Sequence, residues 1–149
     1  MTDRLVSDEF DVPAGLDTPQ YRLRMLTVND VVKDYDAVMS SVEHLKGVLD
    51  PNSNWPEGLS IEQDLIDLGW HQKEFQERSS FAYTMMTPND ERCLGCVYVY
   101  RSEEADADVF MWVRRDEYER LDVHLETAVR EWIESDWPFN TVHYPGRGG

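Results

Sequence analysis

The side chains that could perform acid–base or metal chemistry are spread along this chain without a complete site motif. His71 and Glu74 stand one helical turn apart and are of types that bind metal ions, but no third ligand follows at a suitable spacing. We therefore interpret His71 as a surface or interface histidine and predict no metal site. The sequence also contains no Ser-His-Asp pattern, nucleophile elbow or glycine-rich phosphate loop.

The two cysteines, Cys93 and Cys96, form a CxxC pair. On a β-strand, a separation of three residues points the side chains to opposite faces. No second cysteine pair exists to complete a zinc site, and a disulfide is not expected in an intracellular protein. We predict two small, buried side chains without a redox or metal role.

Hydrophobic periodicity indicates how the chain is organised into strands and helices. Residues 1–20 show no clear period and are predicted to be an N-terminal arm, followed by a single domain over residues 21–149. The expected strands cover residues 21–26, 81–87, 93–101, 108–113 and 139–147. The expected helices cover residues 31–47, 60–78 and 114–137. The predicted order is therefore β-α-α-β-β-β-α-β, with the two early helices separated by a turn-rich loop, which is an α/β (α+β) arrangement.

The late helix has the clearest pattern, because its apolar residues recur at steps of three and four along one face. These residues are Tyr118, Leu121, Leu125, Val129, Trp132 and Ile133. Pro138 then ends the helix, since proline cannot continue it. For the preceding helix, Ser60 and Gln63 form a capping-box pattern that predicts where it begins.

Charge excludes some classes of partner. The chain carries 30 acidic and 14 basic residues, a formal net charge of −16, and only three of the basic residues are lysines. Such a surface repels phosphate backbones and anionic membranes, so we expect neither nucleic-acid nor membrane binding. No apolar run reaches the length of a membrane span and no signal-peptide pattern is present, which favours a cytoplasmic protein. The acidity itself has two explanations, solubility or adaptation to a salty cytoplasm.

Two segments resemble the GNAT superfamily of acyl-CoA N-acyltransferases. Leu94-Gly95-Cys96-Val97 is similar to the third strand of that family, which opens with an apolar residue and glycine. The sequence ADVFMWV over residues 107–113 is similar to its fourth strand, and Asp116-Glu117-Tyr118 resembles the Pro-Glu-Tyr that follows in one acetyltransferase branch. The resemblance covers about residues 21–147. It implies a mixed, mostly antiparallel central sheet flanked by helices.

The resemblance also implies a site for acetyl-CoA. In such proteins the fourth strand binds the pantetheine arm through its backbone, and the start of the next helix binds the pyrophosphate. Residues 114–123 lack the glycines of the family's pyrophosphate loop, so arginines would have to offset the diphosphate charge. The residues predicted to contact the cofactor are Met111, Trp112, Val113, Arg114, Arg115 and Arg120.

The same resemblance suggests catalytic residues and a function. Asp108 stands where some members carry a carboxylate base, although an acid that caps the start of a strand is the alternative. Tyr118, and also Tyr98 and Tyr100, are candidates to protonate a leaving thiolate, although each is also typical of a core tyrosine. The implied function is an N-acetyltransferase that acts on an unidentified amine, either a small molecule or a peptide. The alternative is a catalytically inactive binding or interaction module on the same scaffold.

The chain is short compared with the family. Members usually continue past the fifth strand with another helix and a hairpin, which have no counterpart here. The last strand would then be an unprotected sheet edge. We expect either the N-terminal arm or a second subunit, in a homodimer, to cover it.

Overall fold

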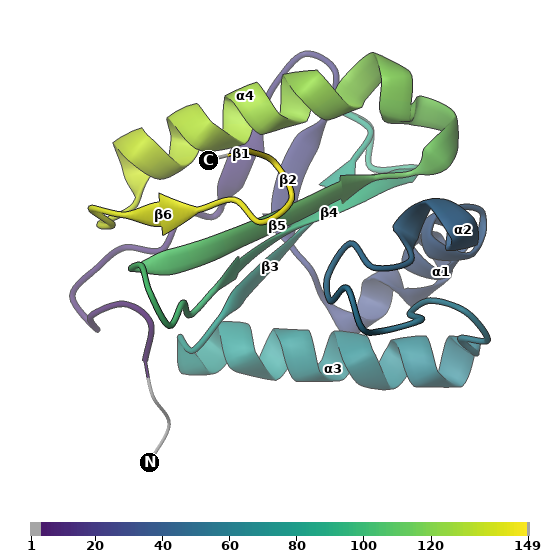
Figure 1. Cartoon of the computed structure of the whole chain (residues 1–149), viewed down its shortest axis with the longest axis horizontal. Helices are drawn as coiled ribbons and strands as arrows, with labels where there is room; N and C mark the ends of the chain where they lie inside the picture. Colours follow the sequence, from purple (N-terminus) through teal and green to yellow (C-terminus); the bar gives the residue numbers. More distant parts are fainter. Residues whose placement is uncertain (1–3, 149) are drawn as a thin grey trace.

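A computed structural model describes residues 4–148 and shows a six-stranded sheet with helices on both faces (Figure 1). The strands follow one another across the sheet in chain order, and every neighbouring pair is antiparallel except the last, which is parallel. They are β1 (Gly15–Asp17), β2 (Arg22–Met25), β3 (Phe81–Met86), β4 (Cys93–Tyr100), β5 (Ala107–Val113) and β6 (Val142–His143). The predicted α+β class and the mixed, mostly antiparallel sheet are confirmed.

The helices form the outer layers. They are α1 (Val31–Met39), α2 (Val42–Leu45), α3 (Ile61–Glu77) and α4 (Tyr118–Asp136), with 3₁₀ turns η1 (Val28–Asp30) and η2 (Arg115–Glu117). Figure 1 shows α4 on one side of the sheet and α1 and α3 on the other. The first predicted helix is interrupted, because Ser41 leaves the helical conformation and its hydroxyl accepts a hydrogen bond from the Arg115 N–H at 2.8 Å. Ser60 caps α3 as predicted, by accepting from the Gln63 N–H.

Each face of the sheet has its own hydrophobic core. The predicted apolar face of α4 is buried against the sheet, except for Tyr118, whose exposed fraction is 39%. The opposite core lies between the sheet and helices α1 and α3, and Trp112 of β5 is among its buried residues. The two faces of β5 therefore look into different cores, and its edge faces β6.

The prediction for the cysteines is wrong in one respect. Cys93 and Cys96 are both buried and free, but they lie in the same core, whereas Leu94 between them lies in the core beneath α4. The pairing of β4 with β3 shifts register near Cys93, so a bulge breaks the normal alternation of side chains. Gly95 lies at this bulge, where a Cβ atom would be only 2.1 Å from the carbonyl oxygen of Trp112. Glycine is therefore required there.

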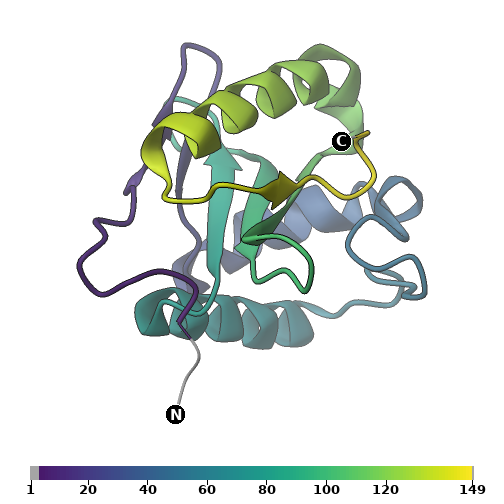
Figure 2. The same ribbon diagram turned by 60° about the vertical axis from the view of Figure 1, so that its left-hand side comes forward.

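The N-terminal arm contains a strand that the sequence analysis missed. Residues 15–17 form β1, which pairs with β2 at the opposite edge of the sheet from β6. Before β1, the carbonyls of Ser7 and Phe10 accept hydrogen bonds from Arg78, which follows α3, and Figure 2 shows the arm passing from α3 to β1. None of the described arm residues, from Arg4 onward, pairs with β6, so the expectation of an arm along that edge is not met there, while coverage of β6 by a second subunit stays a prediction.

Candidate functional site

A groove opens where β5 and β6 separate. The two strands pair only at Ala107–Val142 and Asp108–His143, so the remainder of β5 has no strand neighbour on that side. The groove has a volume of about 350 Å³. Its lining includes Met111, Trp112, Val113 and Tyr118, together with His44, Asp122, Glu126 and Arg147. An unpaired strand edge offers backbone groups to an extended ligand.

Side chains of the protein itself already bind two carbonyls in this groove. The Arg147 Nη2 atom donates to the Met111 carbonyl at 3.1 Å, and the His44 Nε2 atom lies 3.2 Å from the Val113 carbonyl. Arg147 also forms a bidentate ion pair with Asp122, at 2.8 and 2.9 Å, and its Nη1 atom donates to Glu126 at 3.1 Å. These carboxylates raise the pKa of Arg147 although its burial acts in the opposite direction. Arg147 is thus a firmly held charge within the groove.

The resemblance predicts a pyrophosphate site at the start of α4, where the three predicted arginines are joined by a fourth, Arg92, which pairs with Asp116 and Glu117. Arg114 is buried, with only 5% of its side chain exposed, and pairs with Asp36 and Asp116. Arg115 and Arg120 are each 57% exposed, and they pair with Glu119 and Glu117, respectively. Because Ser41 holds the Arg115 N–H, that donor is also in use. The residues therefore fit a pantetheine arm along β5 once Arg147 moves away, but they form no glycine-lined phosphate cradle.

The two predicted catalytic residues lie in different places. Tyr118 lies in the groove, and its ring makes an edge contact with His44 at a centroid distance of 4.6 Å. Asp108 lies at the beginning of β5, far along the strand from Val113, and its Oδ1 atom is 3.6 Å from His143 Nδ1. Tyr118 therefore lies beside β5, the strand predicted to bind the cofactor, whereas Asp108 lies outside the groove.

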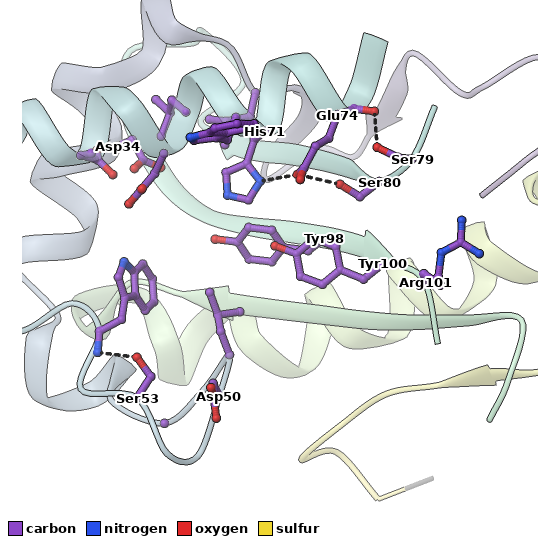
Figure 3. A pocket seen from close by; sticks show the side chains of 18 residues that line it. Asp34, Asp50, Ser53, His71, Glu74, Ser79, Ser80, Tyr98, Tyr100 and Arg101 are labelled. Carbon is purple, nitrogen blue, oxygen red and sulfur yellow. Dashed lines mark hydrogen bonds and ion pairs between the residues drawn. The ribbon is translucent and has the colours of Figure 1, made fainter. Parts of the chain in front are cut away.

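A larger cavity of about 710 Å³ lies on the other side of β5, between α3, β4 and the loop after α2 (Figure 3). Its ionisable lining residues are Asp34, Asp50, Asp64, Asp67, His71, Glu74 and Arg101, and its aromatic ones are Trp55, Trp70, Tyr98 and Tyr100. This cavity was not predicted from the sequence. The spacing of its α3 residues could have indicated it, because residues 64, 67, 71 and 74 follow the three- and four-residue steps of one helix face. Acids and a histidine on such a face of α3 indicate a polar surface turned inwards.

Asp34 and Asp64 are two buried carboxyl groups in this cavity, with exposed fractions of 4% and 3%. Burial raises the pKa of Asp34 well above its ordinary value, and the charge of Asp64 raises it further. Burial also raises the pKa of Asp64, whose Oδ2 atom has no hydrogen-bond partner. Within residues 4–148, neither carboxyl forms an ion pair with a basic side chain. The pair thus favours either a shared proton or a bound cation.

His71 lies further along the same cavity, near Glu74 and Tyr98 (Figure 3). Its Nδ1 atom is 3.9 Å from the Glu74 carboxylate, which also accepts a hydrogen bond from the Ser80 hydroxyl at 3.0 Å. Burial lowers the pKa of His71, although the charge of Glu74 partly opposes that effect. A neutral imidazole within a cavity can accept a proton from a bound ligand. Among the described residues, no group of three potential ligands is arranged around a metal position.

Residues that line the cavity contact residues that line the groove on the α1–α3 face of the sheet. Trp55 of the cavity packs against Trp112 of the groove at a centroid distance of 6.4 Å, and Tyr100 packs against Phe110 at 5.7 Å. Aromatic side chains therefore connect the two spaces. A ligand along β5 and a second ligand in the cavity would approach each other at these side chains.

Comparisons with known proteins agree with this geometry at the level of the fold. No protein-family profile and no curated protein sequence matches the chain. A ribosomal-protein-S5-alanine acetyltransferase from Vibrio fischeri superimposes with a TM-score of 0.63 over 83% of this chain and 67% of its own, at 17% identity. The fold is that of the GNAT acetyltransferases.

Two further GNAT structures were solved with ligands. RimL, a ribosomal L7/L12 alpha-N-protein acetyltransferase in complex with coenzyme A, has a TM-score of 0.62 and 16% identity over 84% of this chain and 69% of its own. The microcin C7 self-immunity acetyltransferase MccE, bound to acetyl-CoA and AMP, has a TM-score of 0.60 and 12% identity over 83% of this chain and 69% of its own. At such identities the likeness shows the GNAT fold alone, and this chain spans about two thirds of each matched chain. No helix in residues 4–148 is both long and apolar enough to cross a bilayer.

Proposed function

We propose that this GNAT-fold protein is an N-acetyltransferase that transfers an acetyl group from acetyl-CoA to a cationic amine. The observation that carries the proposal is the adjacency of two spaces on either side of β5, an open strand edge and an acidic, aromatic cavity. The first suits an extended donor and the second suits a positively charged acceptor. The related fold of proteins crystallised with CoA and acetyl-CoA supports the same donor.

The residues of the chain have distinct roles in this proposal. Acetyl-CoA supplies an acetyl thioester, and the backbone of Met111 and Val113 orients its pantetheine arm. An amine must lose its proton before it can react as a nucleophile, and neutral His71 lies in the cavity where it can accept that proton. Tyr118 lines the groove, and its hydroxyl donates a proton to the departing CoA thiolate to give the free thiol. Arg115 and Arg120 are exposed cations at the start of α4 that can offset the charge of a diphosphate.

Calorimetric titration with acetyl-CoA and with CoA, at low and high salt, tests the donor site. We expect a micromolar dissociation constant, which corresponds to about −8 kcal/mol. Release of free thiol in the presence of acetyl-CoA and an amine then measures turnover. The Arg147→Ala variant is titrated in parallel, because Arg147 occupies the Met111 carbonyl in the native protein. Absence of binding to both proteins would overturn the acetyltransferase proposal.

A second function, a non-catalytic binding module, is favoured by one specific observation. The hydrogen-bonding groups that an acyl-CoA would use are bound by the protein itself, at Met111 by Arg147 and at Arg115 by Ser41. Such a protein would bind a ligand in the acidic cavity without binding acetyl-CoA. Amine binding together with no acetyl-CoA binding by native protein and variant would establish this second function.

A further inference from the structure

We propose that the acidic cavity is a binding site for a linear organic dication, a compound with two ammonium groups, and that Asp34 and Asp64 hold one of these groups. The inference rests on the proposed function in one respect, that the bound ligand is the amine that is acetylated. The binding itself requires no acetyl-CoA.

Two buried acids of the cavity have no basic side chain paired with them among the described residues. Asp34 on α1 and Asp64 on α3 are more than nine-tenths buried and both line the cavity, and the Oδ2 atom of Asp64 is buried without a hydrogen-bond partner. Two further acids act on Asp34: Asp30 is already paired with Arg24 at 2.8 Å, and Asp67 accepts a hydrogen bond from Gln63 at 3.0 Å. A buried carboxylate is costly unless a cation or hydrogen-bond donor compensates it. An ammonium group supplies both.

Acidic and aromatic side chains follow one another along the cavity. Figure 3 places Asp34 and Arg101 at opposite sides of the view, with His71, Glu74 and the tyrosines between them. Glu74 provides a second carboxylate, and aromatic side chains provide faces that attract cations. These aromatic residues are Trp55, Tyr98 and Tyr100, whereas the ring of Trp70 already has Lys73 Nζ over it at 5.0 Å. Arg101 adds a positive charge only at the far side, so the strongest attraction for two cations lies between Asp34 and Glu74.

The protonation of the Asp34–Asp64 carboxyl pair distinguishes binding at this site from binding elsewhere. In the free protein, burial and mutual repulsion favour a proton on Asp34 or Asp64, because two adjacent carboxylates cannot both ionise cheaply. An ammonium group bound between them replaces that proton. Binding at this site therefore releases a proton to the buffer, whereas binding of a cation to exposed acids does not.

The test is calorimetry of the full chain with 1,4-diaminobutane, 1-aminobutane and 1,4-butanediol, each in two buffers of different ionisation enthalpy. We expect the diamine to bind at least about tenfold more tightly than the monoamine, the diol not to bind, and the diamine to release a proton. Asp64→Asn should weaken diamine binding at least about tenfold and reduce proton release, because only burial then raises the pKa of Asp34 substantially. Glu62→Gln, an exposed change on the same helix, is the control and should bind normally. Asp34→Asn is a second variant in case Asp64→Asn does not fold, as judged by circular dichroism.

The outcomes separate this inference from the proposed function. Diamine binding with proton release, but without acetyl transfer, supports the inference and contradicts the acetyltransferase proposal. Acetylation of monoamines and diamines with equal affinity supports the acetyltransferase proposal and overturns the inference. Equal diamine affinity of the native protein and the two aspartate variants, Asp34→Asn and Asp64→Asn, also overturns it.

Discussion

The guanidinium of Arg147 donates a 3.1 Å hydrogen bond to the backbone carbonyl of Met111, on the open edge of β5. The same group binds Asp122 and Glu126 on α4, so it connects the strand to the helix across the groove. A ligand that pairs with β5 at Met111 must compete with this charged side chain. The C-terminal segment therefore sets the affinity of the groove for any extended ligand.

Replacement of Arg147 by Ala should increase the affinity for pantetheine about three- to tenfold, because a hydrogen bond to a charged group is worth about 1.5 kcal/mol. Pantetheine has no phosphate, so titration with it isolates the strand contact from the acidic surroundings. Arg22→Ala is a control, since Arg22 pairs with Asp17 at 3.7 Å between β2 and β1, at the opposite edge of the sheet from the groove. Equal pantetheine affinity in the Arg147 variant and the native protein would contradict this role.

The base of the proposed reaction can be tested by comparing two positions. Substitution of His71 by Gln should lower turnover about 10²- to 10⁴-fold, the usual contribution of a general base. Asp108→Asn should leave turnover within about twofold, because Asp108 lies beside His143 at the other end of β5. Thiol release measured across pH should also lose an acid-side limb in the His71 variant alone. A large loss in the Asp108 variant with normal folding would restore Asp108 as the base.

Local patterns predicted most of the elements in this fold. The apolar period of α4, the Ser60 cap of α3 and the strands β3 to β5 all follow from neighbouring residues, and each is present. The strand β1 was missed because its three residues have no alternation and form a strand only through pairing with β2. The predicted side-chain direction of Cys96 relative to Cys93 was wrong, because a bulge shifts the alternation of side chains along β4. That bulge depends on the pairing of β4 with β3.

The candidate site was less predictable, since its contacts join distant parts of the chain. Asp34 and Asp64 meet only because α1 packs against α3, and no local spacing relates the two residues. The contact of Arg147 with Met111 likewise depends on how the chain returns after β6. The family resemblance located the groove at Met111, but it contained no information on the acids of the cavity.

Arg114 is predicted to stabilise the fold more than Arg115, although both were assigned to the cofactor. Its guanidinium donates to Asp36, Ser40, Asp116 and the Cys93 carbonyl from an almost fully buried position. Replacement of Arg114 by Ala should lower the free energy of unfolding by about 1–3 kcal/mol, because it leaves the buried Cys93 carbonyl without this donor, whereas Asp36 and Asp116 are largely exposed and stay solvated. Arg115→Ala, at an exposed ion pair, should change it by less than about 1 kcal/mol. Urea denaturation measures both, and similar losses would show that Arg114 is not a structural residue.

Asp34 should make stability depend on pH in a direction opposite to that of a salt-bridged acid. Its pKa in the folded protein is raised, so the folded state binds the proton more tightly than the unfolded state. Stability is therefore lost as the pH rises from the ordinary carboxyl pKa through the raised one. Asn cannot ionise, so Asp34→Asn should stabilise the protein by about 1–3 kcal/mol at about pH 8 and by much less at about pH 4.

Thermal melting of the native protein, Asp34→Asn and the exposed control Glu62→Gln at both pH values provides the measurement. The control should show no pH-dependent difference from the native protein, because Glu62 lies in the solvent at the first turn of α3. Addition of 1,4-diaminobutane should reduce the advantage of the Asn variant at high pH, since the dication stabilises only the ionised pair. If Asp34→Asn is equally destabilised at both pH values, the Asp34 carboxyl is ionised and compensated in the free protein, and the cavity has no need of an external cation.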